Sequence, residues 1–373
     1  MELLQSLITF VIFIAILGGL VLVHEIGHFV TARLAGVRVL EFGIGFPPRA
    51  KVLRTTGETL YTLNWLPIGG FVKLEGEDGD EGDDPRSFVR ARLPVKLVIL
   101  LAGVFMNLVT ALVIFTIIAW VATPLIGVRA PTVEPGSPAA AAGIRSGDAI
   151  ISIDGQKYEF FAQYVGSPDV LDDLRAHAGE TIVIGLHRAD GSFEEVTATL
   201  RTPAQVAAGE GALGIRATEE SPFVTDFYGE TVGHDLGTAV RIGVDETGRW
   251  FGLILAGLGD LVGSFVSNPT APPPVAGPVG IATQIGDIFW GSGPILTLYV
   301  AGILSANLAL VNALPFPPLD GGRILMILLK SVFGARLSLR AERLTYFVGF
   351  VFLFAFLIWV TGFDIVRIFG GGS

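Results

Sequence analysis

The sequence predicts an α-helical polytopic membrane protein, with about four transmembrane helices, a membrane-associated β region and one inserted α+β domain. Of the 373 residues, 51% are hydrophobic and only 16% are charged, a balance too apolar for an ordinary soluble enzyme. Four long stretches carry no charged side chain, and each reaches the roughly 20 residues that a helix needs to cross the hydrocarbon core. A β-rich segment separates the first two stretches, and a segment of soluble composition separates the second from the third. The charge-free stretches are residues 3–23, 97–123, 288–319 and 344–363.

The first element, residues 1–36, is expected to be a transmembrane helix that the protein retains. Its apolar stretch lacks the basic n-region and the A-x-A-like exit of a secretory signal. It also runs directly into His24 and Glu25. We therefore interpret it as a span and not as a cleaved leader.

Residues 37–94 predict a membrane-associated β region followed by an acidic cytoplasmic loop. The β-rich pieces are apolar enough to enter the cytoplasmic leaflet, where protein or water must satisfy the exposed backbone groups. The acidic run at residues 75–84 is typical of a solvated loop, and we assign it no chemistry. Turn signals separate the pieces at Pro47-Pro48, Thr56-Gly57 and Gly69-Gly70.

A second span, residues 95–123, leads into a soluble segment at residues 128–203. Within it, VEPGSPAAAAGIRSGDAIISIDGQ combines a turn, a short alanine helix, a strand and an Asp-Gly turn, and this string resembles the core of a PDZ domain. The remainder fits a helix at residues 170–178 and a hairpin that turns at Asp190-Gly191. The resemblance implies a single PDZ-like unit, whose peptide site would include Gly143 and Ile144.

Beyond this unit, residues 204–290 predict an extracytoplasmic linker. Apolar residues recur between 234 and 267, but charged residues interrupt them, so we expect a helix that lies along the membrane surface. The stretch 271–280 has the composition of a rigid, proline-rich connector. Residues 291–330 then predict a third, broken transmembrane segment, and residues 341–368 a fourth span.

Lysine and arginine are concentrated in two loops, at residues 33–96 and 330–343. Because short cytoplasmic loops carry an excess of basic residues, both loops are expected to face the cytoplasm. The long connection from residue 122 to residue 288, with its PDZ-like unit, and both termini then lie on the other side. We expect a multi-pass protein of the cytoplasmic (inner) membrane, with any site on the first span placed toward the cytoplasm.

The sequence HEIGH closes the first charge-free stretch. It places His24 and His28 four residues apart, so a helix presents both imidazoles on one face, able to bind a single Zn²⁺. Glu25 projects beside them, as a general base must. Ionisable residues in a spanning helix usually mark function. The alternative is that these three residues lie at the water interface and merely end the helix.

A catalytic zinc needs a third protein ligand, and the chain contains no cysteine, which excludes thiolate sites as well as disulfides. The other histidines, His177, His187 and His234, fall in the segment expected on the opposite side of the membrane. That leaves a carboxylate from another span. Asp320 closes the third charge-free stretch within NALPFPPLDGG, whose prolines and glycines predict a broken span of the kind that often frames a site. The alternative is that Asp320 only caps the next helix.

Taken together, HEIGH on the first span, a single PDZ-like unit and an LDG motif on the third span resemble the site-2 protease family of intramembrane metalloproteases, bacterial branch. The resemblance covers nearly the whole chain in order and topology. It implies one Zn²⁺ held by His24, His28 and Asp320, with Glu25 as the catalytic base.

The resemblance also implies residues that contact substrate. The family's Gly-x-x-x-Asn motif is matched by Gly103 and Asn107. Asn107 would donate to the developing oxyanion, or would instead hold two helices together beside a small residue. Asn312 matches an asparagine ahead of the broken segment and would hold an unwound substrate backbone.

A hairpin strand that pairs with substrate in this family is matched here by GGFVKL. A helical substrate hides its scissile carbonyl groups, so it must unwind, and β-addition satisfies the exposed backbone while it does. The residues expected to contact it are Gly69, Gly70, Phe71 and Val72. The alternative is a strand that only covers the site. Family members often carry two PDZ units where this chain has one, so their way of excluding large substrates is not carried over.

The predicted function is that of an intramembrane zinc metalloprotease acting on single-span membrane proteins, such as anti-sigma factors or remnant signal peptides. Its partners would be these substrates and the lipid bilayer, with no nucleic acid, and the oligomeric state stays open. A non-catalytic adaptor that binds C-terminal tails through the PDZ-like unit is the alternative, which loss of Glu25 or of a ligand would favour. A transporter would be expected to show internal repeats, and we find none.

Overall fold

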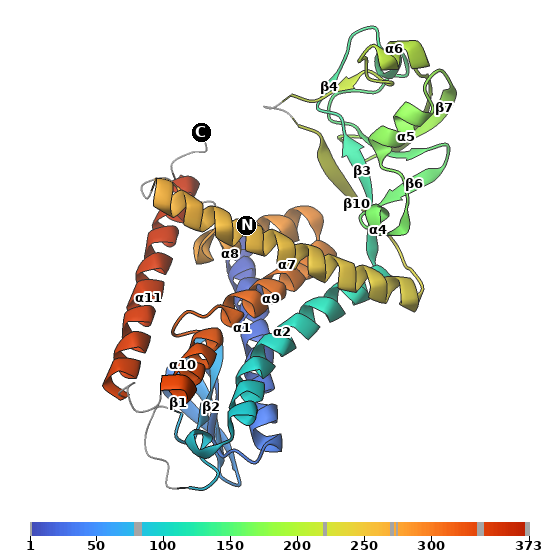
Figure 1. The fold of residues 1–373 in the computed structure, drawn as a ribbon. Coiled ribbons are helices and arrows are strands. Elements are labelled where there is room, and N and C mark those ends of the chain that lie inside the picture. Colours follow the sequence, from blue (N-terminus) through green and yellow to red (C-terminus); the bar gives the residue numbers. More distant parts are fainter. Residues whose placement is uncertain are drawn as a thin grey trace. The chain divides into compact units, whose positions relative to one another are not determined.

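The structure, a computed structural model, describes residues 2–77, 84–218, 222–268, 272–273, 275–333 and 339–369. Most of the acidic run and parts of the proline-rich connector lie outside these residues. The chain divides into two compact units (Figure 1). The first comprises Met1–Phe115 and Glu246–Ser373, and the second comprises Thr116–Asp245.

Four long apolar helices correspond to the four predicted spans, and the chain is a multi-pass membrane protein. They are α1 (Glu2–Leu34), α2 (Leu93–Val121), α9 (Pro294–Ala313) and α11 (Leu339–Phe369).

A fifth helix, α7 (Leu236–Ser267), is also long and apolar enough to cross a membrane. The sequence predicted a surface helix here because charged residues interrupt it. The charged residues are concentrated in the first half of α7, and Asp260 is the only charged residue between residues 250 and 267. Within the first unit, α7 runs crosswise to α11 (Figure 1), an orientation compatible with the surface position that its sequence favours.

Small residues bring the membrane helices together. Gly27 of α1 lies against α2, where a Cβ at this position would come within 2.8 Å of Met106 Cγ. Gly302 of α9 lies against Phe115 of α2, and Ser305 Oγ donates to the carbonyl of Asn107 at 2.7 Å. Small and hydroxyl-bearing residues commonly fill such interfaces, because they let two backbones approach.

The third charge-free stretch forms two helices and not one. Helix α8 (Pro278–Ser292) ends where Gly293 adopts a φ of 84°, and α9 begins at Pro294. The proline-rich connector is therefore shorter than expected, because α8 starts within it. The first turn of α8 is held by the buried Asp364 of α11, which accepts hydrogen bonds from the N–H groups of Gly277 and Gly280.

The predicted β region is a sheet made of two long, bent strands, β1 (Val39–Thr56) and β2 (Thr59–Leu74). The first half of β1 pairs with both halves of β2, so that Ile44 lies opposite Leu63 on one side and Gly70 on the other. The two strands thus supply four antiparallel segments in the order 49–56, 59–64, 39–46 and 70–74. Segment 70–74 is an edge, and within the described residues no strand pairs with its outer side.

The break predicted around the LDG motif is present. Helix α9 ends at Ala313, a turn follows, and α10 (Asp320–Phe333) begins at the aspartate. The turn folds back closely on α10: a Cβ on Gly322 would lie 2.6 Å from the Phe316 carbonyl oxygen. The Gly-Gly pair therefore permits the close approach that fixes Asp320 at the start of the helix.

The second unit is an α+β domain that extends past the expected bounds of residues 128–203. Its six-stranded sheet has the order β10-β3-β6-β5-β7-β8, with β4 and β9 paired separately. The predicted hairpin of β7 and β8 and the helix α5 are present. Strand β10 pairs with β3, so residues 224–232 belong to this sheet and not to a linker. The elements are β3 (Thr123–Arg129), β4 (Thr132–Val133), α3 (Pro138–Ala141), β5 (Ala149–Ile153), β6 (Gln156–Glu159), α4 (Ala162–Val165), α5 (Val170–Ala176), β7 (Thr181–His187), β8 (Phe193–Thr199), α6 (Pro203–Ala207), β9 (Ile215–Arg216) and β10 (Val224–Val232).

Candidate active site

A cavity of about 410 Å³ lies in the first unit, where α1, α2, α9, α10 and the edge segment of β2 meet. Its lining includes every residue that the sequence implicated in catalysis or metal binding: His24, Glu25, His28 and Asp320. Phe46 of β1 lines it as well, so residues from six elements surround one space, as expected of a binding or catalytic site.

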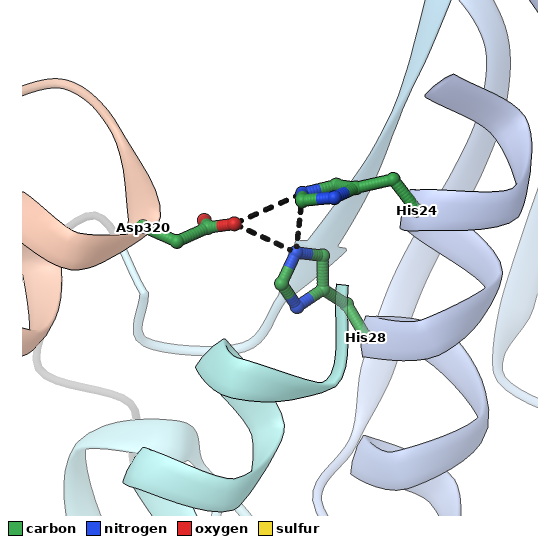
Figure 2. A group of neighbouring side chains, drawn as sticks. All are labelled: His24, His28 and Asp320. Carbon is green, nitrogen blue, oxygen red and sulfur yellow. Dashed lines mark hydrogen bonds and ion pairs between the residues drawn. The ribbon is translucent and has the colours of Figure 1, made fainter. Parts of the chain in front are cut away.

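The two histidines of α1 point their Nε2 atoms to one place (Figure 2). These atoms lie 3.1 Å apart, and both side chains are buried. His28 Nδ1 lies 2.8 Å from the carbonyl oxygen of Ile99 in α2. A carbonyl only accepts, so this nitrogen carries the proton, and Nε2 of His28 is left with its lone pair free for a metal.

The side chain of Asp320, at the start of α10, points toward the two histidines (Figure 2). Its Oδ2 lies 2.9 Å from His24 Nε2 and 3.2 Å from His28 Nε2. In the part of the chain that the structure describes, this is the one cluster of three potential metal ligands. The three ligand atoms thus form a nearly equilateral triangle.

The donor set fits a zinc ion. Zn–N and Zn–O bonds of about 2.0–2.1 Å in a tetrahedral site place neighbouring ligand atoms roughly 3.3 Å apart. The separations of 2.9, 3.1 and 3.2 Å come close to this value. Two imidazoles and one carboxylate also leave the fourth position open for water, which is the pattern of catalytic sites.

Asn107 of α2 lies behind His24 and is fully buried. Its amide contacts His24 Nδ1 at 3.3 Å, while its Oδ1 has no hydrogen-bond partner within the described residues. If His24 binds metal through Nε2, its Nδ1 carries a proton and needs an acceptor. Rotating the amide by half a turn places Oδ1 where it accepts from this nitrogen, so the contact favours Asn107 as the residue that orients His24.

Glu25 is half-buried and faces the same cavity from α1. Opposite it lies Gly70 of the β2 edge segment, where a Cβ would come to 3.5 Å from Glu25 Cγ. The carboxylate is therefore close to both the metal-ligand cluster and the edge strand. This is the position a general base needs if a peptide is held along that strand.

Gly103 provides the space in which the two imidazoles meet. A Cβ on this residue would lie 2.7 Å from His24 Nε2 and closer still to His28 Nε2. We expect Gly103→Ala to displace the rings and to weaken zinc binding by about 10–100-fold, the range seen when ligand orientation is lost. Zinc titration of the purified protein measures this effect.

The matched control is Gly19→Ala in α1, where an added methyl group meets no other atom within 4 Å. This variant should bind zinc normally, because the added methyl group displaces nothing. The helix should also stay stable, since alanine is the better helix former. Unchanged zinc affinity in Gly103→Ala would contradict the role given to this glycine.

The structure places the remaining predicted residues as follows. Asn312 lines the cavity, together with Gly70, Phe71 and Val72, and Gly69 precedes them in β2. The histidines at 177, 187 and 234 lie in the second unit.

The two residues expected to form a peptide site in the second unit, Gly143 and Ile144, have their N–H groups engaged within the domain. Ile144 is packed in the core, and the N–H groups of Gly143 and Ile144 already bond to Ala140 and Ala139. Neither N–H group is available to a peptide carboxylate, because the short helix α3 ends through these bonds.

Two further charged residues line the cavity, and the sequence did not indicate either of them. Arg323 of α10 lies three residues after Asp320, on the same face of the helix, and it is ion-paired with Glu77, which follows β2. Its spacing of three residues from Asp320 was the sequence feature that could have indicated Arg323 as a residue of the site. From the sequence, Arg323 was expected within the broken third segment, and we assigned it no role.

The chain is similar to a known peptidase family and to several known metalloproteases. The model of peptidase family M50 matches residues 12–356. The chain is 29% identical to the zinc metalloprotease RasP of Geobacillus kaustophilus, over 99% of each protein. It is 33% identical to a putative zinc metalloprotease of Clostridium perfringens, over 93% of this chain and 96% of the relative. It is 31% identical to a probable chloroplastic membrane metalloprotease of Arabidopsis thaliana, over 88% of this chain and 73% of that protein.

Proposed function

The chain belongs to peptidase family M50 and is a zinc metalloprotease, and on that premise we propose that it hydrolyses peptide bonds of membrane proteins at the cavity formed by α1, α2, α9, α10 and β2. The observation that carries this proposal is the convergence of His24, His28 and Asp320 on one point inside a helix bundle. These three residues would hold the zinc. The adaptor alternative is set aside, since all three and Glu25 are present.

Each residue of the site has a defined task in this mechanism. When bound, zinc supplies Lewis acidity, which lowers the pKa of water toward about 7 and polarises a carbonyl group. Glu25 takes a proton from the attacking water, whose oxygen adds to the scissile carbonyl carbon, and then returns the proton to the leaving amine. Asn107 holds the His24 ring in place, and Asn312 is positioned to bond the unwound substrate.

Metal removal tests the proposal directly. Treating the purified protein with phenanthroline should abolish cleavage of a single-span model substrate, because the chelator takes the zinc from its three ligands. Added zinc should restore cleavage. A non-chelating isomer of phenanthroline is the control and should have no effect. Cleavage that persists after zinc has been removed would contradict the proposal.

The substrate is proposed to bind as an added strand on segment 70–74 of β2. This segment is a sheet edge whose outer side pairs with no strand among the described residues, and it lines the cavity beside Glu25. An unpaired edge offers N–H and C=O groups to an extended chain. A substrate helix that unwinds there exchanges its internal hydrogen bonds for bonds to β2, and its carbonyl groups become accessible.

Cross-linking can test this strand addition, because the natural chain has no cysteine. We expect Val72→Cys, combined with Glu25→Gln to prevent cleavage, to form disulfides with a model substrate that carries one cysteine at successive positions. The yield should alternate with position, since side chains of a strand point to opposite faces in turn. Gel electrophoresis without reductant measures the yield.

Thr55→Cys is the matched control, because it is exposed and lies in segment 49–56 at the opposite edge of the same sheet. It should give little cross-linking. Equal yields from the two edges, or yields without alternation along the substrate, would contradict strand addition.

The remaining functional expectations are proposals of the same kind. The substrates are single-span proteins such as anti-sigma factors or remnant signal peptides, and the site faces the cytoplasmic side of the inner membrane. The second unit is a PDZ-like domain that controls entry from the opposite side. The basic residues of the loops at 33–96 and 330–343 support this orientation.

A further inference from the structure

A second and larger cavity, of about 700 Å³, adjoins the active-site cavity. It lies in the first unit, between the 3₁₀ turn Phe88–Arg90 (η1), the first residues of α2, helix α10 and the start of α11. The two cavities share four lining residues, so they adjoin along a common wall. The shared residues are Glu77, Leu100, Pro318 and Arg323.

The larger cavity is basic. Among the residues that the structure describes, its lining contains four basic side chains and two acidic ones. The acidic groups are each engaged by a cation, Glu77 by Arg323 and Glu342 by Lys330. The basic lining residues are Lys96, Arg323, Lys330 and Arg343.

Lys96 carries part of the excess charge, and no carboxylate in the described part of the chain is paired with it. Its Nζ donates to the carbonyl oxygen of Val89 at 2.7 Å and lies 5.9 Å from the centre of the Phe88 ring. These neutral groups hold the ammonium at the cavity wall. An anion that entered the cavity would therefore find Lys96 available for an ion pair.

The charges of the active-site cavity are opposite. Of the side chains described there, three carboxylates line it, those of Glu25, Glu77 and Asp320, and Arg323 is the one lysine or arginine. Hydrolysis adds the elements of water across the C–N bond. The acyl half becomes a carboxylate at neutral pH, and the other half leaves as an amine that takes up a proton. When zinc is bound, its charge would offset that of Asp320, whereas Glu25 and Glu77 would repel the new carboxylate and Arg323 would attract it.

We propose that the basic cavity binds the newly formed C-terminal carboxylate of the product, with Arg323 as its first contact and Lys96 as the second. This inference rests on the proposed function. Arg323 faces both cavities, so a carboxylate that replaces Glu77 as its partner moves from the acidic cavity into the basic one. A planar guanidinium suits this exchange, because it bonds a carboxylate through two parallel N–H groups.

The test measures binding and not cleavage. The probe is a fluorescein-labelled apolar peptide of alternating alanine and leucine, made once with a free C-terminal carboxylate and once as the C-terminal amide. The protein is the Glu25→Gln variant, freed of zinc by a chelator and held in detergent. Neither metal nor base then contributes to binding, so the result is independent of whether the enzyme cleaves as proposed.

Fluorescence anisotropy should show the carboxylate form binding about tenfold more tightly than the amide, as expected for one charge-assisted hydrogen-bonded pair. Arg323→Gln should remove this preference, and Lys96→Gln should reduce it. The second variant leaves the Glu77 pair intact, so it remains informative if Arg323→Gln folds poorly. Arg340→Gln is the matched control: this arginine is exposed, lies in the first turn of the same helix as Arg343 and does not line the cavity.

Equal binding of the two peptide forms would overturn the proposal, as would an Arg340→Gln variant that loses the preference as fully as Lys96→Gln. Lipid headgroups are the other source of an anion at this depth. If the two peptides bind equally, and if nanodiscs of phosphatidylglycerol but not of phosphatidylcholine stabilise the protein in a Lys96-dependent way, the cavity binds lipid phosphate and not product.

Discussion

Replacing Glu25 with glutamine is expected to lower the rate of peptide hydrolysis by about 10²–10⁴-fold, the range for losing a general base, without loss of zinc. Glutamine keeps the size of the side chain but cannot take a proton from water. The carboxylate lies beside the ligand cluster and is not itself one of the three converging ligands. Cleavage of a tagged single-span substrate measures the rate, and emission spectrometry measures zinc per chain.

The matched control is Glu58→Gln, because Glu58 is exposed at the turn between β1 and β2 and pairs with Arg86 at the surface. Surface pairs of this kind contribute little, so activity should be retained. Full activity of Glu25→Gln would remove this residue from the mechanism. Loss of zinc together with activity would instead assign Glu25 to the metal site.

The metal ligands could be proposed from the sequence because the information is partly local. A spacing of four residues on a charge-free helix places His24 and His28 on one face without any knowledge of the fold. Asp320 was reached by elimination, since the other histidines fall in a different segment and no cysteine exists. The structure brings its carboxylate within hydrogen-bond distance of His24 across 296 positions of sequence.

Contacts that depend on packing were not available from the sequence. The role of Gly103 in making room for two rings follows from where α2 crosses α1. The ion pair of Arg323 with Glu77 depends on how α10 lies against the sheet. No periodic sequence pattern predicts either contact, because each joins elements that are far apart in the chain.

In the β region, too, the local structure could be predicted from the sequence, whereas the pairing between distant segments could not. Turn signals and β-rich pieces predicted strands correctly between residues 37 and 73, and Thr56-Gly57 lies at the turn between β1 and β2. The order of the segments was not predictable, since Ile44 pairs with Gly70 and with Leu63 at once. That order makes segment 70–74 an edge. In the second unit, β10 was missed for a similar reason: its partner β3 lies far earlier in the chain.

Asp320→Asn is expected to lower zinc affinity by at least about 100-fold, since loss of even a supporting partner of a ligand costs 10–100-fold. An asparagine offers a neutral amide oxygen in place of a carboxylate, so two uncharged imidazoles would have to hold the ion alone. Zinc content after dialysis should fall from one ion per chain toward none. Peptide hydrolysis should fall with it, and excess zinc should restore part of the activity.

The matched control is Asp364→Asn, which removes the same charge from another buried aspartate of the first unit. Asp364 accepts hydrogen bonds from the N–H groups of Gly277 and Gly280 and has no place in the cavity. Its replacement should lower the free energy of unfolding by about 1–3 kcal/mol while zinc content stays normal. If both variants lost zinc equally, the loss would reflect a weakened scaffold. Zinc loss confined to Asp320→Asn would show that this carboxylate, brought to α1 by the broken third segment, is itself a ligand.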